Sequence, residues 1–221
     1  MLTKYQEARH DVRAQMLETI EILAKANEEG LKALEAQETL KLEEIRKSIK
    51  CIYDCSEKID NDIVLIFARY TPEAKDLREM VAYLKITSSL NRIRTNINNY
   101  LKNMQSMLDE DDVNIAQFIK ESLSINRCTV NAFNKTIEMF QTYDDNDRIK
   151  QLAIEIDVEF AKTDDIYALL EKSVLQKMEE ANGKAEEYFN LLKYIRKNLK
   201  IIDRLDSISQ RIIFARMGGK L

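Results

Sequence analysis

The sequence lacks most of the residues that make tight turns. Its 221 residues include no tryptophan, only one proline, Pro72, and four glycines. A β-rich fold needs many turns, and glycine and proline supply most of them. Hydrophobic residues make up 45% of the chain and charged residues 33%, a mixture typical of a soluble helical protein with a core. The composition therefore predicts an all-α fold.

The chain also lacks an excess of positive charge and any long apolar run. Its formal net charge is −4, so the surface as a whole is poorly suited to the phosphate backbone of nucleic acid. No apolar run is long enough to span a bilayer, and residues 1–7 contain no apolar signal core. We expect a cytoplasmic protein that neither binds nucleic acid nor inserts into a membrane.

Cysteine and histidine are scarce. The chain has three cysteines, Cys51, Cys55 and Cys128, and one histidine, His10. An odd, sparse count argues against a disulfide framework, and one histidine makes a zinc site of the usual Cys/His kind hard to complete. We interpret the cysteines as buried, reduced thiols.

Catalytic motifs are missing too. The sequence shows no nucleophile–histidine pairing and no glycine-rich phosphate loop. We therefore expect no enzymatic activity, and we interpret His10 as an ordinary helix residue.

Apolar periodicity and break signals predict six long helical segments in succession. They cover approximately residues 5–29, 31–69, 71–108, 113–143, 144–181 and 185–217. Gly30 ends the first segment, and Thr71 and Pro72 separate the second from the third, as the N-cap and the first-turn residue of the third. The remaining expected breaks are the acidic segment 109–112, a cap at 144–147, a turn at Asn182-Gly183 and an end at Gly218-Gly219.

One stretch has the period of a β-strand instead. Ile154, Ile156, Val158 and Phe160 alternate with acidic residues. A lone strand cannot satisfy its backbone hydrogen bonds, and no partner strand is visible in the sequence. We therefore predict a helix here as well.

The three-segment plan repeats after 112 residues. This shift places Thr71-Pro72 on Gly183-Lys184, and Leu90-Asn91-Arg92-Ile93 on Ile202-Asp203-Arg204-Leu205. A repeat on this scale indicates duplication of a bundle. The sequence therefore predicts two tandem, duplicated three-helix bundles, residues 1–109 and 110–221.

The third and sixth helices each have an apolar face and a polar face. The apolar stripe of the third consists of Ile86, Leu90, Ile93, Ile97, Leu101, Met104 and Leu108. Its opposite face carries Leu77, Val81, Leu84, Ser88, Asn91, Thr95, Asn98 and Asn99. We interpret the uncharged polar residues of this face as hydrogen-bonding between helices. The sixth helix has its core face at Ile202, Leu205, Ser209 and Ile212, and its polar face at Arg196, Lys200, Asp203 and Ser207.

A basic stripe lies beside the polar face of the sixth helix. It consists of Lys193, Arg196, Lys197, Lys200 and Arg204. Such a stripe can hold an inorganic anion or meet an acidic partner. It can also be a solvated face paired with nearby acids, here Asp164, Asp165 and Glu171, and we favour this second interpretation. The stripe is nevertheless our first candidate for a partner-binding surface.

The segment Ala68–Arg78 contains a proline followed four residues later by Asp-Leu-Arg, at Pro72, Asp76, Leu77 and Arg78. This pattern resembles the signature of the PhoU family. The following Leu90-Asn91-Arg92-Ile93 is similar to the family's next segment, usually Leu-Glu-Arg-Ile-Gly-Asp. The resemblance covers essentially the whole chain. It implies a cytoplasmic regulator of phosphate uptake, a homodimer, that binds the ATP-binding subunit of a phosphate ABC transporter, a sensor histidine kinase, or both.

The resemblance also points to metal positions. Family members typically carry an acidic residue followed four residues later by Asp, once in each half, and such pairs can share a metal ion, iron or zinc in some members. The matching positions here are Asn91 with Thr95 and Asp203 with Ser207, and only Asp203 is a carboxylate. Amides and hydroxyls are weak ligands without anionic support. We therefore expect no cofactor and no tightly bound metal.

Three alternatives remain open at the level of sequence. The first is a metal-binding helical bundle in which Asp203 recruits Asp60 or Asp157 from neighbouring helices. The second is a helical scaffold or coiled-coil adaptor with no phosphate role. The third is a module that serves a different phosphate carrier, such as a sodium-coupled one.

Overall fold

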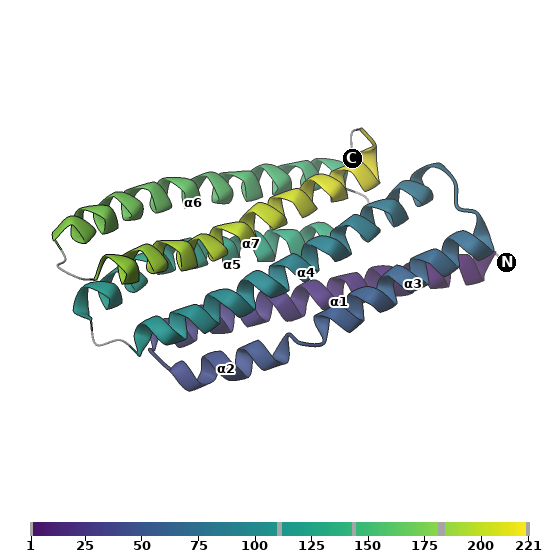
Figure 1. The fold of residues 1–221 in the computed structure, drawn as a ribbon. Helices are drawn as coiled ribbons and strands as arrows, with labels where there is room; N and C mark the ends of the chain where they lie inside the picture. Colours follow the sequence, from purple (N-terminus) through teal and green to yellow (C-terminus); the bar gives the residue numbers. More distant parts are fainter. Residues whose placement is uncertain (1, 110–111, 143–144, 181–183, 220–221) are drawn as a thin grey trace.

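The protein is all-helical, as its composition predicts. The computed structural model describes residues 2–109, 112–142, 145–180 and 184–219. Within these ranges the chain forms seven α-helices and no strand (Figure 1). The helices are α1 (Leu2–Glu35), α2 (Thr39–Ser48), α3 (Ile52–Tyr70), α4 (Ala74–Leu108), α5 (Val113–Gln141), α6 (Asn146–Glu180) and α7 (Ala185–Met217).

Several expected breaks are confirmed, with identifiable caps. The Asp112 carboxylate accepts hydrogen bonds from the backbone N–H groups of Asn114 and Ile115, which begins α5. The Asp145 carboxylate accepts from the backbone N–H of Arg148 at 2.8 Å near the start of α6. Gly218 ends α7 with φ of 82°. The turn expected at Asn182-Gly183 lies outside the described residues.

The first helix does not end at Gly30. Instead, α1 continues to Glu35, and the chain leaves it through Gln37, which has φ of 55°. A Cβ atom on Gly30 would lie 2.9 Å from Cδ2 of Leu101. Gly30 therefore lets α1 approach α4 closely, and the sequence signal for a helix end was in fact a packing requirement.

The long second helix expected from the sequence is two helices, α2 and α3, separated by residues 49–51. The link to α4 also differs from the prediction. Thr71 is the C-cap of α3, in the left-handed region with φ of 42°, and Glu73 occupies the N-cap position of α4. Thr71 precedes Pro72, and a residue before proline is disfavoured in the right-handed helical region, so the helix ends there.

The alternating stretch in α6 is helical, as predicted. Ile156 is fully buried and Phe160 packs against the core, whereas Ile154 and Val158 are exposed. Each pair is four residues apart and shares one helical face. The apparent strand period therefore arises from two apolar pairs on opposite faces of one helix.

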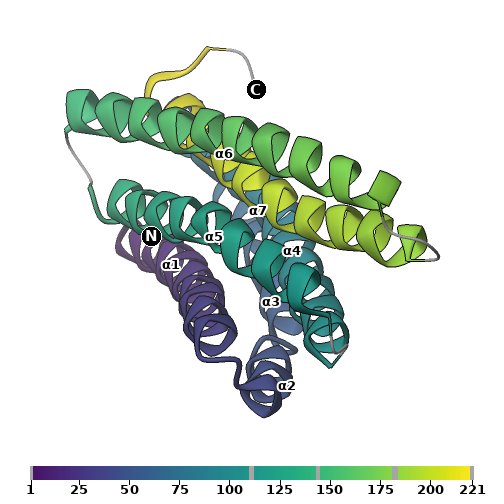
Figure 2. The same cartoon turned by 90° about the vertical axis from the view of Figure 1, so that its left-hand side faces the viewer.

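The helices pack side by side, with α4 against α7 and α1 against α5 (Figures 1 and 2). In both views α6 lies on one side of the molecule and α2 on the other. The buried side chains form one contiguous core that includes Met16, Leu42, Ile59, Ile93, Phe133, Ile156 and Leu205, one from each of the seven helices. The division into units of residues 1–109 and 110–221 stays a prediction.

The repeat of 112 residues is visible in the burial pattern. Leu90 and Ile93 on α4 are fully buried, and so are Ile202 and Leu205 at the equivalent positions of α7. The apolar stripe expected on α4 is buried except for Leu108, which is half-buried. The four expected core residues of α7 are all buried.

Candidate functional site

The Asp-Leu-Arg signature lies in the first two turns of α4, where Asp76 contacts α1. Arg9 on α1 places Nη1 2.8 Å from Oδ1 of Asp76 and Nε 2.6 Å from Oε2 of Glu79. Leu77 is exposed, and Arg78 is half-buried beside Gly218 at the end of α7. Asp76 therefore contributes to a contact between helices.

Glu79 is the centre of a buried charge network that the sequence analysis did not identify. Its side chain is 3% exposed, and Nη1 of the equally buried Arg216 on α7 lies 3.4 Å from its Oε1. The Tyr83 hydroxyl donates to the same oxygen at 3.0 Å, and burial followed by the Glu79 charge raises the Tyr83 pKa. The network joins α1, α4 and α7, and breaking such a buried pair is costly. The feature of the sequence that could have indicated this network is an acidic residue at a core-facing position of α4.

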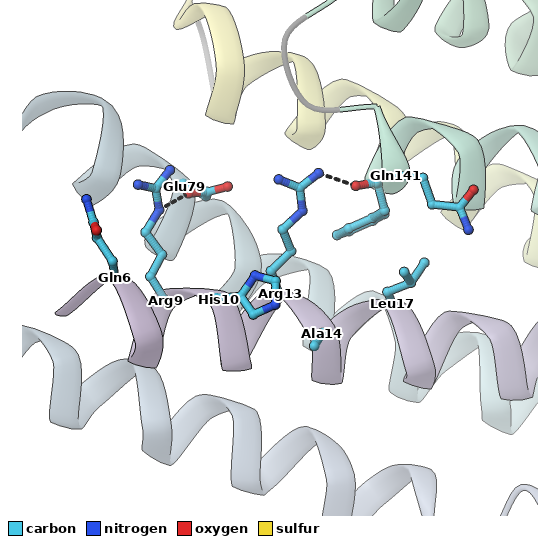
Figure 3. A pocket seen from close by; sticks show the side chains of 9 residues that line it. Gln6, Arg9, His10, Arg13, Ala14, Leu17, Glu79 and Gln141 are labelled. Atoms are coloured by element: carbon cyan, nitrogen blue, oxygen red, sulfur yellow. Dashed lines mark hydrogen bonds and ion pairs between the residues drawn. The ribbon is translucent and has the colours of Figure 1, made fainter. Parts of the chain in front are cut away.

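A cleft of about 590 Å³ opens beside this network. Figure 3 shows Arg9, His10 and Arg13 of α1 along its floor, with Glu79 and the end of α5 opposite. Arg9 is bound to Glu79, and Arg13 donates to the Phe140 carbonyl oxygen. Both guanidinium groups thus connect α1 to neighbouring helices, and His10 is one residue of the cleft lining.

The four positions that correspond to family metal ligands offer one carboxylate. The Thr95 hydroxyl donates to the Asn91 carbonyl at 2.9 Å. Asp203 is half-exposed, and its Oδ2 lies 3.7 Å from Nε of Arg204. Among the described residues, no group of three or more His, Cys, Asp or Glu side chains is arranged to hold a metal. This donor set, with a guanidinium beside its only carboxylate, does not fit a cation.

Of the two acids that were candidates to support Asp203, Asp60 has another partner, whereas Asp157 acts together with Asp203 on a third carboxyl group. Asp60 accepts a hydrogen bond from the Thr87 hydroxyl at 2.7 Å, and burial raises its pKa. Asp206 on α7 has a raised pKa because of burial first, and then the charges of Asp157 and Asp203.

A cluster of cations lies where α4 and α7 meet. It lines a cavity of about 150 Å³ that we call the α4–α7 basic pocket, formed by Lys85, Ser88, Ser89, Arg92, Arg204 and Arg211. Only Arg204 belonged to the basic stripe predicted from sequence. The signal that could have located the pocket is the 112-residue shift, which makes Arg92 and Arg204 equivalent positions on two packed helices.

Comparison with known proteins identifies the first half of the chain. Residues 16–104, which include the Asp-Leu-Arg signature, match the family model described as the PhoU domain. This part of the chain is similar to a PhoU domain. The resemblance stated from the sequence is thereby confirmed over this range. Among curated protein sequences, none matches the chain.

Solved structures extend the likeness beyond the PhoU domain. PhoU from Pseudomonas aeruginosa superposes with a TM-score of 0.71 at 19% identity, covering 96% of this chain and 98% of that one. The phosphate transport system regulatory protein PhoU from Streptococcus pneumoniae gives 0.73 at 18%, covering 98% and 99%. A putative PhoU-like phosphate regulatory protein from Shewanella oneidensis MR-1 gives 0.63 at 12%, covering 92% and 97%. At these identities the likeness shows a shared fold over nearly the whole chain.

The basic stripe of α7 is only partly paired. Nη2 of Arg196 lies 3.9 Å from Oε1 of Glu171, and its guanidinium lies 5.3 Å from the centre of the Tyr167 ring. Of the three acids expected to neutralise the stripe, Glu171 alone forms an ion pair with it in the described part of the chain. Lys193, Lys197 and Lys200 make no ion pair with any described residue.

The polar face of α4 forms hydrogen bonds both to another helix and within α4 itself. Asn98 accepts a hydrogen bond from Nε of Arg46 on α2 at 3.1 Å, which is the expected bonding between helices. Thr95 is exposed and bonds within its own helix.

The interpretation of the cysteines as buried thiols is correct for Cys128 and wrong for Cys51. All three thiols are free, with Cys51 exposed, Cys55 half-buried and Cys128 buried. Cys51 is exposed because it occupies the N-cap position of α3, in the break between α2 and α3. Burial, followed by a hydrogen bond to Glu159, raises the pKa of Cys128 to about 11.

No membrane span is found in the described residues, because none of their helices combines the length and apolarity that crossing a bilayer requires.

Proposed function

We propose that the protein is a regulator of phosphate transport that acts by binding other proteins and breaks no bond itself. The observation that carries the proposal is the PhoU domain over residues 16–104. The likeness over nearly the whole chain to a phosphate transport system regulatory protein from Streptococcus pneumoniae supports it.

The partners that we propose follow from the PhoU resemblance. They are the ATP-binding subunit of a phosphate ABC transporter, a sensor histidine kinase, or both, met in the cytoplasm by a homodimer. The exposed and half-buried cations of the α7 stripe support an acidic surface on the partner, because complementary charge steers association and suppresses wrong partners. Lys197 and Lys200 lie at the centre of this stripe and make no ion pair with a described residue.

The first experiment is a crosslinking pull-down of the tagged protein from its native cells in high and low phosphate. Recovery of a phosphate transporter's ATP-binding subunit or of a sensor kinase would support the proposal. If neither is recovered under both conditions, the proposed function fails while the fold stands, and the scaffold interpretation takes its place.

The partner surface is tested by reversing charge on α7. We expect Lys197→Glu with Lys200→Glu to weaken partner capture, because the changes turn attraction to an acidic surface into repulsion. A matched control, Lys50→Glu with Lys102→Glu, changes the same charge at exposed positions on α4 and the α2–α3 break. Equal capture by both variants would remove the α7 stripe from the proposal.

We also propose that the positions of Asn91, Thr95, Asp203 and Ser207 hold no resident metal. One carboxylate with two hydroxyls and an amide is a weak donor set for iron or zinc. Elemental analysis of the purified protein is expected to find less than about a tenth of an equivalent of either metal per chain. A stoichiometric amount would favour the alternative of a metal-binding bundle.

A further inference from the structure

The α4–α7 basic pocket concentrates positive charge with little compensation. It contains one ammonium group, from Lys85, and three guanidinium groups, from Arg92, Arg204 and Arg211. One ion pair to these cations is present in the described part of the chain, the half-exposed Asp203 beside Arg204 at 3.7 Å. The charges act on one another, since burial first, and then the charges of Arg204 and Arg92, lower the Arg211 pKa.

The side chains of this pocket are held in place by the packing of α4 on α7. The two helices run in opposite directions along the molecule (Figure 1). Nη1 of Arg211 donates to Oγ of the buried Ser89 at 2.6 Å, and this hydroxyl in turn lies 3.4 Å from the Lys85 carbonyl oxygen. Ser89 therefore positions Arg211 across the helix interface and leaves its other N–H groups available.

We propose that the α4–α7 basic pocket binds a small free tetrahedral oxyanion such as inorganic phosphate. Guanidinium groups present planar pairs of N–H donors that match the edges of such an anion, and hydrogen bonds between ionised partners are the strong ones. A bound dianion would neutralise the repulsion among the four cations. The proposal rests on the geometry of the pocket and does not depend on the function proposed above.

The size and chemistry of the pocket limit the ligand. Its volume of about 150 Å³ leaves room for one phosphorus or sulfur atom with four oxygens. The lining contains no carboxylate that could accept the proton of hydrogen phosphate. We therefore expect sulfate to bind about as well as phosphate, within roughly threefold.

The test is calorimetric titration of the full-length protein with inorganic phosphate, against sodium chloride at equal ionic strength. Saturable binding of one phosphate per chain is expected, with no comparable heat from chloride. The double variant that carries both Arg92→Gln and Arg211→Gln is expected to bind phosphate at least about tenfold more weakly, since two charge-assisted donors are lost. Equal response to phosphate and chloride would overturn the proposal, because the pocket would then only attract a diffuse ion atmosphere.

A matched control separates the pocket from general charge. Lys193→Gln with Lys197→Gln removes the same charge from α7 outside the pocket and is expected to leave the phosphate affinity within about twofold. Equal weakening by this pair would overturn the proposal. Arg211 is half-buried, so the pair Lys85→Gln with Arg92→Gln, both exposed, provides a second variant that keeps the Ser89 contact. Adenosine diphosphate binding about tenfold more tightly than phosphate would exclude a free ion as the occupant.

Discussion

Asn126 joins three helices through side-chain hydrogen bonds inside the core. Its Oδ1 accepts from the Tyr100 hydroxyl on α4 at 2.8 Å and from Nδ2 of Asn198 on α7 at 2.7 Å. All three residues are at most 1% exposed. A buried polar group is costly unless it is paired, so this network favours the one arrangement of α4, α5 and α7 in which all three side chains meet.

Removing Asn126 should therefore cost more than removing the hydroxyl of Tyr100. We expect Asn126→Ala to lower the free energy of unfolding by about 3 kcal/mol, because it leaves two buried donors unpaired and creates a small cavity. Tyr100→Phe is expected to cost about 1 kcal/mol. Urea unfolding measures both, with Ser124→Ala as a control at a half-buried position whose hydroxyl bonds to the Glu121 carbonyl within α5. A cost for Asn126→Ala no larger than that for Tyr100→Phe would contradict this role.

The three thiols should differ sharply in reactivity, because only the thiolate attacks a disulfide reagent. Cys51 is exposed, while burial raises the pKa of Cys128 to about 11. We expect dithionitrobenzoate at about pH 8 to modify Cys51 first and Cys128 only after unfolding. The variant Cys51→Ser should lose the fast phase. A rapid reaction of Cys128 in the folded protein would show that its surroundings open far more often than their packing implies.

At the scale of the element, Asp112 links the starts of two helices. Its carboxylate caps α5 and lies 2.8 Å from Nζ of Lys184, the N-cap residue of α7. Hydrogen bonds donated by the Lys184 ammonium first, and then by the backbone N–H groups of Ile115 and Asn114, hold the pKa of Asp112 below its usual value. One short side chain therefore places the beginnings of α5 and α7 next to each other.

Loss of this cap should lower the free energy of unfolding by an amount that depends on pH. We expect Asp112→Ala to cost about 1 kcal/mol at neutral pH. Because the folded-state pKa is lowered, the stabilisation is complete above the unfolded value of about 3.9 and is lost as the pH falls through the folded value. Urea midpoints of the two proteins should thus converge in acid. Asp109→Ala, at the end of α4, is the control, and an equal loss there would assign the effect to general acidity of the segment.

At the scale of the whole molecule, the core does not stop between the two repeats. Helices α4 and α7 come from different halves and pack extensively on one another, and α1 packs on α5. The contiguous core includes side chains from all seven helices. The buried charge network of Glu79 and Arg216 also crosses from one half to the other. Neither half can therefore lose its packing without exposing apolar surface of the other.

We accordingly expect the chain to unfold as a single cooperative unit, although it has two repeats. The absence of tryptophan makes local reporters possible. Phe67→Trp on α3 and Phe160→Trp on α6, both half-buried, should give the same urea midpoint by fluorescence as the circular dichroism of the helices. Two separated transitions would instead support independent folding units at residues 1–109 and 110–221.

The sequence alone determined that the chain is helical, where several helices end, and which faces of α4 and α7 are buried. Helix ends at Asp112, Asp145 and Gly218 are local events, because a cap bonds to backbone groups within three residues of itself. Burial at Leu90 and Ile202 follows from the helical period and the 112-residue repeat.

Only the tertiary structure decided which side chains meet. Asn126 and Asn198 are 72 residues apart, and Ser89 and Arg211 are 122 apart. Periodicity places each residue on a face, but its partner depends on the packing of helices that are distant in sequence. At Gly30 the local signal indicated a helix end, but the glycine instead lies inside α1 where this helix packs closely against Leu101 of α4. The α4–α7 basic pocket, with Arg92 and Arg211 from two halves of the chain, exists for the same reason.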